Sequence, residues 1–167
     1  MKNLWAPWRM TYIAGEDEQA ENQSCIFCVD KDKAGPDKDR LILHVGRLSM
    51  VMMNRYPYNN GHLLVAPRRH VPDLASLTEE EMTDLPAMVR DTIEVMRRDS
   101  SPDGFNVGLN LGLVAGAGVA DHMHFHIVPR WNGDTNFMTV LADVRVVPEH
   151  LEAAFDRLLP YFSSWEA

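Results

Sequence analysis

Five short segments of the chain carry the alternating or continuous apolar pattern that is typical of β-strands. They are residues 40–45, 49–54, 62–66, 105–111 and 122–130. The turn signal Gly46-Arg47 separates the first two, and the turn-rich stretch 55–61 separates the second from the third. Because short turns join strands that run in opposite directions, we expect antiparallel pairing. On this pattern His44 is a strand residue that faces solvent.

A helix is predicted to begin near Thr78. Thr78-Glu79-Glu80-Glu81 has the sequence of a capping box, and Arg97 and Arg98 favour the C-terminal end of the helix. The predicted apolar stripe consists of Met82, Leu85, Val89, Ile93 and Met96. Pro86 removes one bond of the helical ladder, so a kink is expected there. A last helix is expected to begin at Pro148, with Leu151, Phe155, Leu158 and Leu159 on one face.

The segment 122–130 places three histidines, His122, His124 and His126, at every second position. Side chains alternate faces along a strand, so the three imidazoles should point the same way, roughly 6.6 Å apart. The apolar residues between them should point into the core. Since the whole chain has only 7 histidines, chance is a poor explanation of this row.

Composition narrows the class of protein. The 167 residues suit one domain with a sizeable core, and 46% hydrophobic and 24% charged residues are ordinary for a globular protein. A net charge of −8 argues against a nucleic-acid partner, although a few local arginines could hold a small anion. The N-terminus lacks the continuous apolar region of a secretory signal, and no run reaches the ~20 apolar residues of a membrane span. A cytoplasmic location is therefore expected, with no membrane partner.

The histidine row allows two chemistries. Alternating histidines could bind a catalytic metal, as in a metal-dependent oxidase, or the middle histidine could attack phosphorus. The small-residue loop 112–118 precedes the row and allows backbone amides to approach a phosphate, and Arg130 ends it. Backbone donors, the Arg130 cation and a histidine nucleophile are therefore expected to lie close together. This favours a reaction on a bound anion.

The nine residues His122-Met123-His124-Phe125-His126-Ile127-Val128-Pro129-Arg130 resemble the signature of the histidine triad (HIT) superfamily. The stretches 54–57 and 61–67 also resemble the family's upstream strand pair, so the resemblance covers about residues 25–136. Within the superfamily, the stretches 4–9, 55–59 and 129–137 look most like bacterial diadenosine tetraphosphate phosphorylases. The resemblance implies an α+β fold, with an antiparallel sheet of about five strands and two main helices.

A two-step nucleotidyl transfer is the activity that the resemblance implies. His124 would attack the α-phosphorus of a nucleotide and form a nucleotidyl-histidine, and phosphate or water would then release the nucleotide. His126 and His62 would hydrogen-bond the phosphate oxygens. The residues implied for nucleotide binding are Asn54, for the ribose, and Asn110, Gly118 and Val119. The mechanism requires no catalytic metal.

The pair Cys25 and Cys28 is by itself consistent with a metal site or a redox pair in a cytosolic protein. The resemblance implies His70 as a third ligand and His122 as a fourth, which completes the Cys₂His₂ set of a structural zinc site. With zinc bound, His122 would orient the strand and take no part in the chemistry. The alternative is a pair of buried thiols with His70 capping a loop.

One departure from the family concerns the acceptor. Many histidine triad hydrolases carry a glutamine in the loop before the triad, where Ala117 and Gly118 stand here. Its absence favours an acceptor other than water, such as phosphate in the phosphorolysis of diadenosine tetraphosphate to ADP and ATP. Hydrolysis of dinucleoside polyphosphates or nucleoside phosphoramidates, and nucleotide binding without turnover, are the alternatives.

The domain division expected from the sequence is an N-terminal extension, residues 1–24, followed by one HIT domain, residues 25–167. Family members commonly pair through a continuous sheet, so the resemblance implies a homodimer. The tryptophan-containing extension would then clamp a surface or the partner subunit.

Overall fold

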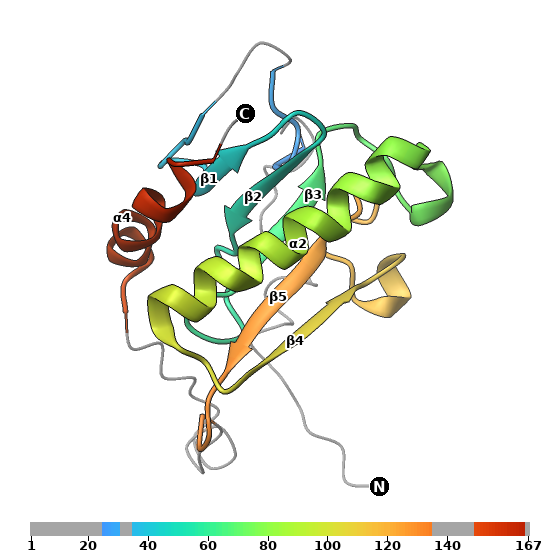
Figure 1. Cartoon of the computed structure of the whole chain (residues 1–167). Helices are drawn as coiled ribbons and strands as arrows, with labels where there is room; N and C mark the ends of the chain where they lie inside the picture. Colours follow the sequence, from blue (N-terminus) through green and yellow to red (C-terminus); the bar gives the residue numbers. More distant parts are fainter. Residues whose placement is uncertain (1–24, 31–34, 135–148, 166–167) are drawn as a thin grey trace, which may run out of the picture.

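The computed structural model describes residues 25–30, 35–134 and 149–165. A five-stranded sheet is formed by β1 (Ile42–Val45), β2 (Ser49–Met53), β3 (Leu63–Pro67), β4 (Gly104–Leu109) and β5 (Phe125–Arg130). The strands lie in the order β1-β2-β3-β5-β4, and every neighbouring pair is antiparallel. The two main helices are α2 (Glu79–Ser100) and α4 (Leu151–Phe162), as Figure 1 shows. The predicted α+β arrangement is confirmed.

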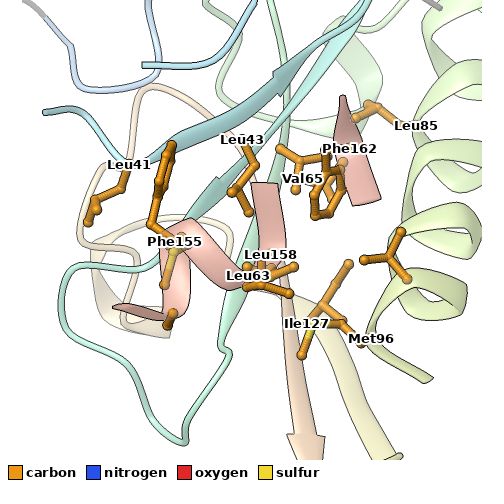
Figure 2. Packing of buried hydrophobic residues seen from close by; sticks show 14 residues of the cluster. Leu41, Leu43, Leu63, Val65, Leu85, Met96, Ile127, Phe155, Leu158 and Phe162 are labelled. Atoms are coloured by element: carbon orange, nitrogen blue, oxygen red, sulfur yellow. The ribbon is translucent and has the colours of Figure 1, made fainter. Parts of the chain in front are cut away.

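Both helices cover the same face of the sheet, where the larger hydrophobic core lies (Figure 2). The sheet contributes Leu43, Val51, Met53, Leu63, Val65 and Ile127, and the helices contribute Leu85, Val95, Met96, Ala154, Phe155, Leu158 and Phe162. The alternation of faces predicted for the histidine segment therefore holds along β5. Leu63, Val65 and Ile127 point toward the helices. Leu64 and Ala66, which alternate with them along β3, point to the opposite face and pack in a smaller cluster.

The N-terminus of α2 is capped as the sequence predicts. The Thr78 side chain accepts from the Glu81 backbone N–H, and the Glu81 carboxylate accepts from the Thr78 N–H at 2.8 Å. The helix continues through Pro86 to its end. One member of the predicted stripe was wrong: Met82 is 45% exposed, whereas Glu81 is buried and pairs with Arg69. The Glu81 side chain is therefore buried in place of Met82, because its carboxylate accepts the capping hydrogen bond and pairs with Arg69.

The strand of the histidine row is shorter than predicted, because β5 begins at Phe125 and not at His122. Val65 pairs with Phe125, and continuing this register would place Met123 opposite Pro67. Pro67 has no N–H to donate, so the ladder with β3 stops. Met123 donates instead to the carbonyl of Val71 at 2.8 Å. His122 and His124 therefore lie in the chain that enters β5.

The prediction that His44 faces solvent was wrong. The register between β1 and β2 shifts between Ile42 and His44, so that His44 pairs with Val51, a residue of the helix-side core. This bulge turns the imidazole toward α2, where it lines a cavity with Asp84 and Met88. His44 is only 7% exposed and meets the edge of the Trp165 ring at 5.2 Å. Burial lowers the pKa of His44, and the nearby Asp84 carboxylate offsets part of that effect.

Other boundaries move by one or two residues. β1 and β3 begin after Arg40 and His62, and β4 ends at Leu109, which leaves Asn110 in the loop that follows. The last helix begins at Leu151; Pro148, like the expected extension 1–24, lies outside the described residues. None of the described helices is both long and apolar enough to cross a membrane.

Candidate active site and metal-ligand cluster

The three residues predicted to act on phosphate, His62, His124 and His126, lie together on the face of the sheet away from the helices. His62 directly precedes β3 and His126 lies in β5, opposite Leu64. The His62 and His126 ring centroids are 5.1 Å apart, and those of His124 and His126 are 4.9 Å apart. The fold therefore brings His62, which is remote in sequence, into line with the row.

A chain of hydrogen bonds fixes the protons on two of these rings. The Tyr58 backbone N–H donates to Nδ1 of His62 at 3.0 Å, so the His62 proton must lie on Nε2. Nε2 of His62 then donates to Nδ1 of His126, also at 3.0 Å. The proton of His126 consequently lies on its Nε2. His126 is thereby prepared to donate a hydrogen bond, which suits a phosphate oxygen.

His124 has the opposite arrangement. Its Nδ1–H donates to the backbone carbonyl of His122 at 3.0 Å, which leaves the lone pair on Nε2. The residue is 5% exposed, and this burial lowers the pKa of His124, although the bond to the carbonyl opposes the effect. The ring of Phe27 stacks on the imidazole at 4.6 Å and 27°. His124 is thus a neutral, oriented imidazole, and such a ring attacks phosphorus without first losing a proton.

The residues predicted to bind nucleotide lie around this row, and each makes different contacts. Asn54 braces the row: its amide nitrogen lies 3.3 Å from Nδ1 of His62, and its Oδ1 accepts from the Tyr56 N–H. Asn110 donates to the carbonyl of Gly116 at 3.3 Å and lines a cavity of about 430 Å³ together with His126, Tyr58 and residues of β4.

The loop before the row places the other two predicted residues differently. Gly118 is exposed, whereas Val119 is partly buried against the smaller core cluster that contains Phe27. Val119 therefore lies beside the cluster that contains Phe27, whereas Asn110 lines the cavity beside His126.

Cys25, Cys28, His70 and His122 form the predicted metal-ligand cluster, with ligand atoms all within 4.8 Å of one another. Nδ1 of His122 lies 3.4 Å from the Cys25 sulfur, and Nδ1 of His70 lies 3.3 Å from the Cys28 sulfur. His122 donates its Nε2–H to the Pro67 carbonyl at 2.8 Å, so its lone pair faces the thiols. Two thiols and two imidazoles are the donors that tetrahedral zinc prefers, so the residues fit that ion.

The electrostatics of the cluster also suit a cation. Burial, followed by the charge of Cys25, raises the pKa of the Cys28 thiol. Burial likewise lowers the pKa of His122, more than its bond to Pro67 raises it. Two close thiolates disfavour each other, and a bound divalent ion offsets that repulsion and favours deprotonated thiols. A bound divalent ion would therefore be needed to keep both thiols deprotonated.

Comparison with known proteins identifies the family. The sequence model of the HIT domain matches residues 35–133, more than half of the chain. The chain belongs to the HIT domain family. The resemblance read from the histidine row is confirmed, and the three histidines of the signature are His122, His124 and His126.

Relatives extend the similarity beyond this HIT domain. A Mycobacterium tuberculosis protein named AP-4-A phosphorylase is 40% identical over 154 residues, which span 90% of this chain and 79% of the relative. The asymmetrical bis(5'-nucleosyl)-tetraphosphatase of Schizosaccharomyces pombe is 41% identical over 53% of this chain and 48% of its own length. The crystal structure of a zinc-bound histidine triad family protein from Mycobacterium smegmatis has a TM-score of 0.60 and 26% identity, and the match covers 74% of this chain and 84% of that protein.

Sequence reasoning missed two residues of this HIT domain that touch the histidines. Tyr58 fixes the proton of His62 through its backbone and packs its ring 4.7 Å from His62 and 5.6 Å from His126. Phe27 stacks on His124, and its position between Cys25 and Cys28 was the available signal. Tyr58 lies in a turn-rich stretch, where the pattern predicts a change of direction but not a contact.

Proposed function

We propose that this HIT domain protein is a nucleotidyl transferase that acts on dinucleoside polyphosphates through a nucleotidyl-His124 intermediate. The preferred reaction is phosphorolysis of diadenosine tetraphosphate to ADP and ATP. The observation that carries the proposal is the hydrogen bond from Nδ1–H of His124 to the His122 carbonyl. It leaves a nucleophilic lone pair on Nε2, in a ring whose centroid is 4.9 Å from that of His126. The phosphorylase name of the M. tuberculosis relative supports the substrate class.

In the first step, the Nε2 lone pair of His124 attacks the α-phosphorus and forms a P–N bond. The bond between that phosphorus and the bridging oxygen breaks, and ATP leaves with the electron pair. The Nδ1–H stays on the ring and its bond to the His122 carbonyl strengthens as the imidazole becomes positive. His126 donates from Nε2 to a phosphate or bridging oxygen, and the loop amides near Gly118 and Val119 stabilise the charge on the equatorial oxygens.

In the second step, an oxygen of inorganic phosphate attacks the nucleotidyl phosphorus, the P–N bond breaks and ADP leaves. Ala117 and Gly118 offer no side chain able to orient a water, which favours phosphate as the acceptor. Water as the acceptor would give a hydrolase, which the S. pombe tetraphosphatase makes the second candidate. Asn54 holds the ribose, and Asn110, at the cavity beside His126, contacts the nucleotide.

Cys25, Cys28, His70 and His122 hold a structural zinc ion in this proposal. The ion would fix the chain that enters β5, because His122 is both a ligand and, through its carbonyl, the hydrogen-bond acceptor of His124. The reaction itself uses the imidazoles and backbone donors of the chain and no catalytic metal.

The remaining features of the proposal concern the setting of the enzyme. Residues 25–167 form the HIT domain and residues 1–24 an N-terminal extension. The protein works in the cytoplasm as a homodimer, and its ligands are small nucleotides; nucleic acid and membranes are not partners. The net charge of −8 supports the exclusion of nucleic acid.

The proposal is tested by mass spectrometry of the protein mixed briefly with diadenosine tetraphosphate. The wild type should gain one AMP on His124, and His124→Ala should gain none. His150→Gln is the matched control, because His150 is an exposed histidine at the start of α4. Release of ADP should require added phosphate. An unmodified His124 during turnover would refute the intermediate, and equal turnover without phosphate would make the enzyme a hydrolase.

A further inference from the structure

The aromatic ring of Phe27 is the flat surface against which His124 lies. The two ring centroids are 4.6 Å apart with only 27° between their planes, and Phe27 is 1% exposed. The same ring meets His122 at 5.2 Å in a tilted arrangement. A phenyl ring that contacts two consecutive histidines of the row belongs to the surroundings of the nucleophile, although it brings no polar atom to the reaction.

Phe27 is itself held from several sides. The backbone N–H of Cys28 donates to the Cys25 carbonyl at 3.0 Å, which closes the turn that contains Phe27. The Arg40 guanidinium donates to the carbonyls of Ile26 and Cys28, each at 2.7 Å. The ring packs in the smaller core cluster with Ile42, Val45, Met50, Met52, Leu64 and Ala66. Phe27 is therefore a fixed surface that cannot readily follow a moving imidazole.

One hydrogen bond is not enough to aim an imidazole. Rotation about the bond between Cβ and the ring is broad for histidine, and the bond from Nδ1 to the His122 carbonyl tolerates a range of ring tilts. A flat aromatic contact restricts the tilt that the hydrogen bond leaves open. Attack on phosphorus requires the Nε2 lone pair to lie in line with the leaving oxygen, so a small error in tilt costs rate.

We propose that Phe27 is a positioning residue that holds the plane of the His124 ring for in-line attack. The inference rests on the proposed function, since it assigns His124 the role of nucleophile. Phe27 acts through His124 and contributes to the rate of P–N bond formation more than to nucleotide binding. The loop that carries two metal ligands thereby also carries the surface that orients the nucleophile.

The variant that tests the inference is Phe27→Leu, which keeps an apolar side chain of similar size and removes the flat face. Formation of the nucleotidyl-His124 adduct should slow by about 10- to 100-fold, while the Kd of substrate changes less than about twofold. Phe27→Tyr keeps the ring and should stay within about threefold of the wild-type rate. Ile42→Val is the matched control, because it trims a buried residue of the same cluster and should leave the rate unchanged.

A readout that does not depend on turnover separates positioning from general stability. In ¹⁵N-resolved NMR spectra of the histidine side chains, wild-type His124 should give one neutral form with its proton on Nδ1. Phe27→Leu should shift the carbon-bound ring protons of His124, which lose the ring current of Phe27, and should broaden them as the ring tilts. Ile42→Val should leave the His124 signals unchanged.

Three results would overturn the inference. They are an unchanged adduct rate in Phe27→Leu, a Phe27→Tyr variant as slow as Phe27→Leu, and a loss of rate that follows a loss of bound zinc. The last would mean that Phe27 only maintains the cysteine loop. Failure of the proposed function is distinguishable, because then the wild type forms no adduct while the NMR difference between wild type and Phe27→Leu persists.

Discussion

The carbonyl oxygen of His122 accepts the Nδ1–H of His124 at 3.0 Å, so a predicted metal ligand also orients the predicted nucleophile. His122 donates from Nε2 to Pro67, which leaves its Nδ1 for the metal cluster. His122 thus contacts the end of β3, the metal-ligand cluster and the nucleophile, each through a different atom. Loss of the metal should consequently slow the reaction, although none of the four ligands is assigned a contact with the substrate.

Cys28→Ser is predicted to remove the zinc and to lower both stability and the rate of His124 modification. A closed four-ligand site depends on every ligand, so the free energy of unfolding should fall by about 2 kcal/mol or more. Metal analysis and urea unfolding of the purified variant would measure both effects. Ser163→Ala, at an exposed position after α4, is the control. Full zinc content in Cys28→Ser would contradict the assignment of the ligand.

The hydrogen-bond chain through His62 predicts which substitutions there are tolerated. His62→Phe removes the donor to Nδ1 of His126, so the proton of His126 is no longer fixed on Nε2, and adduct formation should slow by about 10- to 100-fold. His62→Gln offers an amide N–H close to the position of Nε2 and should recover part of the rate. The comparison of single-turnover rates measures this, and equal rates for the two variants would argue against the chain.

The alternation of side chains predicted much of this site. It placed His126 and Ile127 on opposite faces, and the confirmed sheet follows from short strands and turns that are local properties of the sequence. The early end of the ladder at Pro67 could not be predicted, since it depends on which strand lies beside β5. For the same reason the bulge that buries His44 was missed: a shift of register is a property of a pair of strands and not of one segment.

Contacts between remote segments were the other limit. The pairing of Cys25 and Cys28 with His70 and His122 came from a family resemblance, because no local pattern connects residues so far apart in the chain. Phe27 shows what is lost without such a guide. An apolar residue between two cysteines predicts burial, and only the folded arrangement places its ring flat on His124.

The ion pair between Arg69 and Glu81 predicts a loss of stability in acid. Arg69 donates to both carboxylate oxygens, at 3.0 and 2.7 Å, and, with a smaller contribution from the Thr78 cap, lowers the pKa of Glu81 to about 2 from an ordinary 4.5. As pH falls, the unfolded chain binds this proton first, so the stabilisation present at neutral pH is lost between about pH 5 and pH 2. The difference corresponds to about 3 kcal/mol.

Arg69→Met should remove most of that acid dependence and lower stability at pH 7, as urea unfolding at several pH values would measure. Arg47→Met is the control, because the pair between Arg47 and Glu80 is exposed on both sides. If the unfolding free energy of Arg69→Met changed with pH in parallel with that of the wild type, another carboxylate would cause the loss of stability in acid.

His44 predicts a second pH effect, at a higher pH. Burial lowers its pKa below the ordinary 6.5, so the folded protein resists a proton that the unfolded chain accepts. Stability contributed by the neutral ring is therefore complete above about pH 6.5 and declines as the pH falls below it, by up to about 1.4 kcal/mol per pH unit. His122 and His124, whose pKa values burial also lowers, add slopes of the same sign.

His44→Phe should reduce the slope of unfolding free energy between pH 6.5 and pH 5 without abolishing it, since the other two histidines still contribute. The phenyl ring keeps an aromatic contact with Trp165, so stability above pH 7 should change little. His150→Gln removes an exposed histidine and should leave the profile unchanged. If His44→Phe retained the full slope, the imidazole of His44 would have to be solvated in the folded protein, contrary to its turn toward α2 at the bulge of β1.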